Sequence, residues 1–185
     1  MSLFTSHTIE TAPEAAQDIL KGAQKQLGFL PNLFANLAEA PQTLKAYMQL
    51  GDLMEKSSFS PEEQQVIFLT ASVEHGCEFC VAAHSVIAKK MVGVAEERVN
   101  AIRQRSGTDS EKINALIDFT QAVIRQRGWV GDEAVKTFLD AGYTKQQVLE
   151  VVLGISMKII SNYTNHITGT ETNKEFASEA WSKDA

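Results

Sequence analysis

Two cysteines and a histidine near the middle of the chain could together carry out redox chemistry. Cys77 and Cys80 are the chain's two cysteines, and His84 follows four positions after the second. Side chains three or four positions apart share a helix face, with their β-carbons about 5–6 Å apart. A small adjustment in a first helical turn brings two such cysteines within disulfide range. We expect His84 to reach the sulfur of Cys80 as a base or hydrogen-bond partner.

The residue before the first cysteine predicts where the helix starts. Gly76 is expected to bend or interrupt the preceding helix and so place Cys77 in the first turn of a new one. The unpaired N–H groups and positive dipole at a helix start favour a thiolate over a thiol. One thiolate could then attack an electrophilic oxygen or a disulfide, and the second thiol would resolve the sulfenic acid or mixed disulfide.

Other interpretations of these residues stay open at this point. The two cysteines could be ordinary core residues, since free cysteine is among the most buried residue types. Cys77, Cys80 and His84 could instead be three zinc ligands, although no fourth ligand is evident at motif spacing. His75 is expected to be exposed beside the bend. His166 is expected to be a satisfied polar helix end, or alternatively to line the site or an interface.

The elements that must position these residues are helical. The periodicity is helical almost throughout, and no run shows the alternation of a half-buried strand. Capping pairs mark helix starts and glycines mark helix stops. The capping pairs are Thr11 with Glu14, Ser60 with Glu63, Thr108 with Glu111 and Thr144 with Gln147, and the glycines are Gly28, Gly93, Gly128 and Gly142. The expected helices span 13–27, 32–39, 41–56, 61–75, 77–92, 95–105, 110–127, 132–141 and 145–166.

Two of these helices have informative apolar patterns. The helix from 61 is apolar on most sides, which predicts a buried central helix leading directly into the cysteines. The last helix carries a core face expected from its spacing. That face consists of Val148, Val151, Val152, Ile155 and Ile159. The fold class is therefore all-α, a bundle of about eight or nine helices.

Composition limits the class of protein. A hydrophobic fraction of 44% in 185 residues fits one globular domain over 1–185, with an N-terminal arm at about 1–12 and a polar tail at about 170–185. Phe176 and Trp181 in that tail are expected to dock on a neighbouring subunit. The net charge of −6 and the lack of a basic cluster exclude a nucleic-acid partner. No signal peptide or membrane span is recognised, so a cytoplasmic location is expected, where a structural disulfide would not persist.

Four stretches of the chain resemble the alkylhydroperoxidase AhpD-like group of the carboxymuconolactone decarboxylase family, in its peroxidase-related branch. The third stretch is the specific one, because it matches the pattern Gly-Cys-x-[Tyr/Phe]-Cys-x-x-x-His. The stretches are Gly28-Phe29-Leu30-Pro31-Asn32-Leu33-Phe34, Phe59-Ser60-Pro61-Glu62-Glu63, the segment from Gly76 to His84, and Gly142-Tyr143-Thr144 with the helix ending Asn162-Tyr163-Thr164-Asn165.

The resemblance implies a thiol-dependent hydroperoxide reductase with an AhpD-like fold. Cys80 would attack the peroxide, Cys77 would resolve the sulfenic acid to a disulfide, and His84 would belong to a proton relay. The partners implied are a small hydroperoxide, an external dithiol reductant or its carrier protein, and further copies of the chain in a trimer or hexamer. No cofactor or metal is expected.

The sequence departs from the family pattern at one position of the relay. The glutamate that starts it is replaced by Gln65, which cannot move a proton as a carboxylate does. Glu63 lies on another helix face, and Glu74 could substitute if the bend at Gly76 allows it. The alternatives are a carboxymuconolactone decarboxylase-like acid–base enzyme and a non-enzymatic redox or metal-sensing module.

Overall fold

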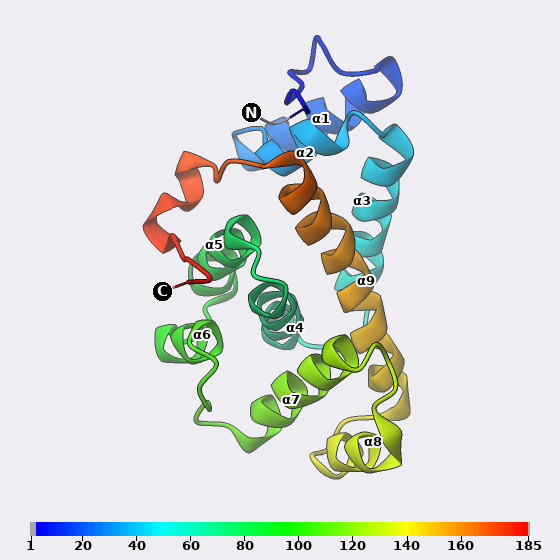
Figure 1. The fold of residues 1–185 in the computed structure, drawn as a ribbon, viewed down its shortest axis with the longest axis vertical. Coiled ribbons are helices and arrows are strands. Elements are labelled where there is room, and N and C mark those ends of the chain that lie inside the picture. The colour runs from blue at the N-terminus through cyan, green and yellow to red at the C-terminus, as the bar shows by residue number, and fades with distance from the viewer. Residues whose placement is uncertain (1–2, 185) are drawn as a thin grey trace.

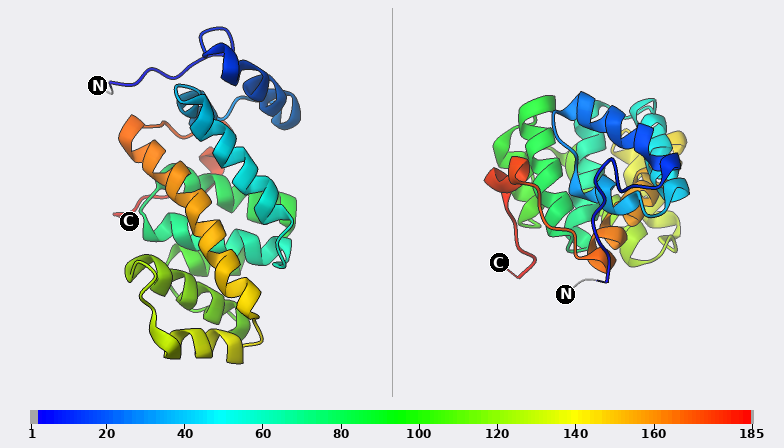
Figure 2. Two further views of the ribbon diagram at one scale, coloured as in Figure 1. Left: turned by 90° about the vertical axis from the view of Figure 1, so that its right-hand side faces the viewer. Right: turned by 90° about the horizontal axis from the view of Figure 1, so that it is seen from above.

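The computed structural model describes residues 3–184, and every regular element in that range is helical. Figure 1 shows the helices arranged around α4, and the left view in Figure 2 shows a body elongated along one axis. The elements are α1 (Glu14–Leu27), α2 (Asn32–Leu37), α3 (Pro41–Glu55), α4 (Pro61–Glu74), α5 (Glu78–Val86), a π-helical turn η1 (Ile87–Val92), α6 (Glu96–Arg103), α7 (Glu111–Arg125), α8 (Gly131–Asp140), α9 (Lys145–Thr168) and a 3₁₀ turn η2 (Lys174–Glu179). The all-α prediction is confirmed.

Local capping explains several of the helix ends. Ser60 and Thr144 each form the expected capping box, in which the cap side chain and the residue three positions on bond each other's backbone N–H. The other two predicted caps are wrong. Thr11 bonds with Thr8 outside the helix, and the cap of α7 is Ser110, whose hydroxyl accepts from the N–H of Ile113.

Helix α4 is the buried central helix that its composition predicts. Residues from Glu63 to Val73 along it are mostly buried, and the helix packs against α5, α7 and α9 (Figure 1). An element enclosed on most sides has little freedom to shift, because protein interiors are close-packed. Its C-terminal end therefore gives the cysteine turn a fixed starting point.

Helix α9 packs on α4 through a different face from the predicted one. Val151 and Ile155 are buried, but Val152 and Ile159 are 47% and 38% exposed, so that part of the prediction is wrong. The reason is that polar residues occupy the buried face. The buried face includes Gly154, Met157, Lys158, Ser161, Asn162 and Asn165. A search for apolar spacing alone therefore predicts a core face that includes solvent-exposed positions.

A glycine allows the close contact between these two helices. A β-carbon at Gly154 would lie 2.8 Å from Cγ2 of Ile67 on α4 and 3.4 Å from Cε of Met54. Real β-carbons do not approach other atoms so closely, so any larger residue would push the helices apart. The close approach brings the C-terminal half of α9 against the cysteine segment.

The C-terminal tail packs against its own chain. The ring of Phe176 lies edge-on to those of Phe29 and Phe79 at 5.5 and 5.8 Å, and Trp181 Nε1 donates to the carbonyl oxygen of Arg103. These two aromatic residues thus have intramolecular partners and stay partly exposed, and docking of the tail on a neighbouring subunit stays a prediction. Among residues 3–184, no helix is both long and apolar enough to cross a membrane.

Candidate active site

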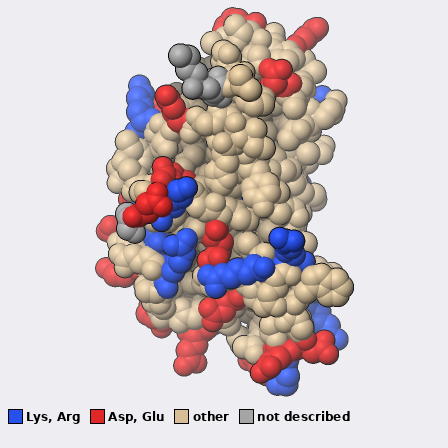
Figure 3. All heavy atoms as spheres, in the orientation of Figure 1, with Lys and Arg blue, Asp and Glu red and all other residues tan. Residues whose placement is uncertain are grey.

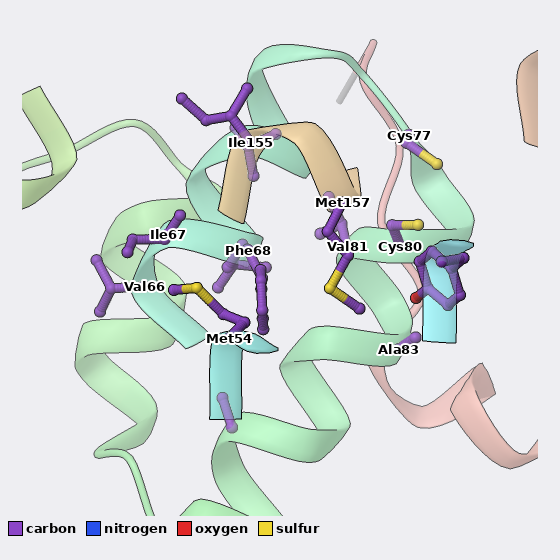
Figure 4. Packing of buried hydrophobic residues seen from close by; sticks show 14 of the residues in the cluster. Met54, Val66, Ile67, Phe68, Cys77, Cys80, Val81, Ala83, Ile155 and Met157 are labelled. Carbon is purple, nitrogen blue, oxygen red and sulfur yellow. The ribbon is translucent and has the colours of Figure 1, made fainter. Parts of the chain in front are cut away.

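The two cysteines lie where α4 turns into α5. Gly76 adopts a φ of +68°, a conformation that side chains disfavour, and Cys77 is the N-cap residue of α5. Both thiols are free and buried, at 1% and 2% exposure. Figure 4 shows both sulfur atoms projecting to the same side of the segment. The bend predicted at Gly76 and the helix start at Cys77 are confirmed.

Asn165 on α9 links the two thiols. Its Nδ2 group lies 3.5 Å from Sγ of Cys77 and 3.3 Å from Sγ of Cys80, with donor geometry toward both sulfurs. The two thiols also lie within hydrogen-bonding range of each other. The shared donor brings both sulfurs to one amide group on α9.

The pKa values of the two thiols are driven apart. The hydrogen bond to Cys80, together with burial, raises the pKa of Cys77 far above its ordinary value. Burial alone would also raise the pKa of Cys80, but the hydrogen bond from Cys77 and the charge of Lys158 lower it to about 6. A coupled pair of this kind holds one shared proton on Cys77 and the negative charge on Cys80. At neutral pH the thiolate form is therefore favoured at Cys80 over Cys77.

Lys158 is the basic residue next to Cys80. Its side chain is fully buried, and its Nζ donates to Nε2 of His84 over 2.8 Å. It also acts on the Cys80 thiolate through its charge and a hydrogen bond. Within residues 3–184 no carboxylate pairs with this ammonium. A buried charge without a partner is costly, so the thiolate and the ammonium stabilise each other.

His84 lies between Lys158 and Gln65. Its Nδ1–H donates to Oε1 of Gln65 over 2.9 Å, and its Nε2 accepts from Lys158. Burial and the charge of Lys158 hold the pKa of His84 well below its usual value, so the ring is neutral. The two ring nitrogens are thus occupied, and His84 communicates with Cys80 through Lys158 and not by the direct bond expected from the spacing. Gln65 occupies the position of the family's relay glutamate and accepts a hydrogen bond from His84 there.

The two glutamates considered as substitutes for Gln65 point elsewhere. Glu74 pairs with Arg125 through two bonds of 2.8 and 2.9 Å. Glu63, in its capping box, pairs with Lys112 at 3.1 Å. Both carboxylates are held by cations away from the dithiol. Neither of them contacts His84, whose ring nitrogens have other partners.

The other two histidines near the site have distinct surroundings. His75 accepts a 2.9 Å bond from Nδ2 of Asn162 and packs edge-on against Tyr163, so it is partly buried and not exposed as predicted. Burial lowers its pKa. His166 is exposed and borders a cavity that reaches Cys77, which matches the second interpretation of this residue.

A metal site of cysteines and histidine does not form from these residues. Among residues 3–184, no group of three or more histidine, cysteine or acidic side chains is arranged to hold a metal ion. His84 shows why, since both of its nitrogens already bond to Gln65 and Lys158. A hydrogen-bonded imidazole with no free nitrogen is not available as a ligand.

Lys158 and Asn165 are residues of the candidate site that the sequence pattern did not identify. They are polar positions on the same face of α9 as Val151 and Ile155, and both are buried. A lysine and asparagines repeated at core spacing in an apolar helix are the signal that could have revealed them, because buried polar groups need partners.

Fold and site together define an all-helical protein with a buried dithiol, in which one thiol is activated by a lysine. Residues 41–122 match the carboxymuconolactone decarboxylase family, and a comparison with curated protein sequences finds no significant match. Residues 41–122 thus belong to that family, and the fold of the chain is AhpD-like.

Solved structures share this fold over nearly the whole chain. A peroxidase-related protein with an alkylhydroperoxidase AhpD core, from Ralstonia eutropha JMP134, has a TM-score of 0.84 at 20% identity over 95% of this chain and 94% of that one. A peroxidase-related protein from Silicibacter sp. TM1040 has a TM-score of 0.78 at 17% identity over 91% and 90%. The debrominase Bmp8 has a TM-score of 0.79 at 20% identity over 97% and 96%.

Proposed function

We propose that the protein is a thiol-dependent hydroperoxide reductase. The Cys80 thiolate attacks the terminal oxygen of a hydroperoxide, the O–O bond breaks, and the leaving alkoxide takes a proton to become an alcohol. The Cys77 thiol then attacks the sulfenic sulfur, giving the Cys77–Cys80 disulfide and water. An external dithiol returns two electrons and two protons. The observation that carries the proposal is the buried thiol pair with one pKa raised and the other lowered to about 6.

Lys158 and His84 supply the proton for the leaving alkoxide in this scheme. The ammonium bonds to the imidazole over 2.8 Å and lies beside the thiolate, so a proton is available where negative charge develops. Gln65 holds the ring through Nδ1 and thereby fixes the tautomer whose Nε2 faces Lys158. The lysine takes over the supply of protons that a carboxylate at position 65 would otherwise begin.

The test is peroxide consumption by single-cysteine variants with an excess of a small dithiol. Cys80→Ser should abolish consumption. In a parallel reaction without any dithiol, Cys77→Ser should consume one equivalent and retain a sulfenic acid that dimedone traps at Cys80. Parent-like turnover by both variants would show that the dithiol is not the working part.

The likeness to Bmp8 supports a second candidate, a reductive dehalogenase that uses the same thiol electrons. One Bmp8 structure is a cysteine-to-alanine variant in complex with 2,3,4-tribromopyrrole. Bromide release from that compound by the parent, absent in Cys80→Ser, would favour this candidate if hydroperoxides are not consumed. The acid–base alternative has less support, because Glu63 and Glu74 are bound to cations away from the site.

The functional unit that we propose is a homo-oligomer formed through the outer face of α9. Apolar side chains lie exposed along that face at helical spacing, and Figure 3 shows a largely uncharged surface where α9 runs. They are Leu149, Val152, Ile159, Tyr163 and Ile167, between 38% and 71% exposed. A stripe of this length is larger than the scattered apolar residues of a monomer surface, which is typical of an interface.

A further inference from the structure

A cavity of about 360 Å³ lies at the start of α5 and reaches one of the two thiols. Its wall includes Cys77 and Asn165, whereas Cys80 is not part of it. Cys80 lies deeper, at 2% exposure, beside Lys158. A molecule in this cavity therefore meets the resolving cysteine and not the nucleophile. The volume is at the lower end of the range for small-molecule sites, about 300–1,000 Å³.

The position of this cavity sets the direction of thiol–disulfide exchange. An incoming thiolate in the cavity would attack Sγ of Cys77, form a mixed disulfide with it, and break the Cys77–Cys80 bond. Cys80 would leave as the thiolate, and a thiol of lower pKa leaves faster. A second thiolate then attacks the external sulfur of the mixed disulfide, and Cys77 departs and takes up a proton. Two thiols are oxidised to one disulfide, and the enzyme dithiol is restored.

A lysine at the cavity favours a thiol that carries a negative charge. Lys183 borders the cavity, and its ammonium group has no ion-pair partner among residues 3–184. The side chain of Lys183 lies over Gly76, with Cδ 3.5 Å from the position of a β-carbon there. Glu78 also borders the cavity, and its carboxylate accepts a 3.4 Å bond from the backbone N–H of Lys183. His166 carries a lowered pKa through burial and the charge of Lys183, so it is neutral.

Asn165 provides an independent reason to expect a ligand. Its Nδ2 is used by the two sulfurs, but its Oδ1 is buried and has no hydrogen-bond partner. The residue is 5% exposed and forms part of the cavity wall. A buried acceptor without a donor is costly, about 1–3 kcal/mol. Because Oδ1 has almost no exposed surface, a ligand with an N–H group next to its thiol would satisfy this oxygen once the Asn165 amide turns toward the cavity.

We propose that this cavity binds the reductant, a small-molecule thiol with a carboxylate for Lys183 and an N–H donor for Asn165. The proposal rests on the dithiol cycle described above and adds the site and chemical class of the electron donor. It also assigns Cys77 as the cysteine that forms the mixed disulfide. The proposal places oxidant and reductant at different sulfurs of the pair.

The test uses the full chain oxidised with diamide, so that it does not depend on any reaction with peroxide. Stopped samples follow the reduction of the disulfide by 3-mercaptopropionate, 2-mercaptoethanol and cysteamine, which are anionic, neutral and cationic thiols. The rate ratio of parent to variant for each thiol cancels the reactivity of the thiol itself. Lys183→Gln should slow the reduction by the anionic thiol about two- to fivefold and leave the rate with the neutral thiol unchanged.

Two further variants test the sign and the location of this effect. Glu78→Gln should make the reduction of the disulfide by 3-mercaptopropionate faster and the reduction by cysteamine slower, the reverse of the effect of Lys183→Gln. Lys174→Gln removes the same charge from an exposed position of the same tail outside the cavity and should change none of the three rates. Equal changes for all three thiols in Lys183→Gln would overturn the proposed charge recognition.

The site of attack and the role of the N–H group have their own readouts. Glutathione disulfide should form an adduct faster with Cys77 in the Cys80→Ser variant than with Cys80 in Cys77→Ser, although Cys80 has the lower pKa. N-acetylcysteine, with its N–H group, should reduce the disulfide faster than 3-mercaptopropionate, after correction for their rates with hydroxyethyl disulfide. Faster adduct formation at Cys80, or a corrected ratio of one, would contradict the proposal. Failure of the peroxide reaction with these results intact would count against the proposed function only.

Discussion

Replacing Lys158 with methionine removes the buried ammonium beside the nucleophile at almost constant side-chain volume. Burial would raise the pKa of Cys80, and the bond from Cys77 and the charge of Lys158 lower it from 9.0 to about 6. Two unit charges about 4 Å apart attract by roughly 4 kcal/mol at an effective dielectric of about 20. That energy corresponds to about three pKa units at 1.36 kcal/mol each. The lowering from 9.0 to about 6 is shared between Lys158 and the bond from Cys77, and that bond remains in the variant. We therefore expect the pKa of Cys80 to rise by about two units.

The rise should appear as a loss of thiolate at neutral pH. At pH 7 about 90% of Cys80 is ionised with a pKa of about 6, and about 10% with a pKa of about 8. Alkylation of Cys80 by iodoacetamide in Lys158→Met should therefore be about tenfold slower at pH 7. The alkylation rates of the parent and the variant should converge near pH 9, where Cys80 is mostly ionised in both proteins. Fragment masses assign the adduct to Cys80.

Control variants separate the charge from the packing. Lys158→Arg keeps a cation and should retain most of the lowered pKa, and Lys145→Met changes an exposed lysine on the same helix and should leave the profile unchanged. The Lys158→Met fold should survive, since Cys80 can take up a proton and leave no uncompensated buried charge. A midpoint that stays near 6 in Lys158→Met would refute the role given to this lysine.

Three other predictions concern the relay, the helix packing and the assembly. Gln65→Glu should raise the pKa of His84 by about one unit or more, measured by NMR of the imidazole, because a carboxylate at 2.9 Å stabilises the charged ring; an unchanged pKa would contradict this contact. Gly154→Ala should lower stability by about 1–3 kcal/mol in thermal unfolding, whereas the matched change Gly22→Ala, with open space around it in α1, should be neutral or stabilising by up to about 1 kcal/mol. Ile167→Asp should reduce the sedimenting mass of the oligomer, and an unchanged mass would exclude this face as the interface.

Much of the fold can be predicted from local signals. The capping boxes at Ser60 and Thr144, and the left-handed glycines Gly28 and Gly93 that end α1 and η1, mark helix boundaries within a few residues. The turn at Gly76 and the burial of α4 also follow from sequence. These features depend on neighbours within one or two helical turns, and such interactions are visible in a short window.

The rest of the site depends on contacts between distant segments. Lys158 meets His84 across 74 positions, and Asn165 meets Cys80 across 85. Both residues lie on the face of α9 that carries Val151 and Ile155, but a search for apolar residues alone does not count polar side chains as buried. Gln65 could be identified as a departure from the family pattern, but its bond to the imidazole required the structure.

The central claim is that Cys77 and Cys80 exchange two electrons with a hydroperoxide. The most direct measurement counts free thiols and records the intact mass of the parent protein before and after one equivalent of a small alkyl hydroperoxide. We expect both thiols to disappear, the mass to fall by that of two hydrogen atoms, and a dithiol to reverse both changes. Two titratable thiols and an unchanged mass after the peroxide would contradict the account.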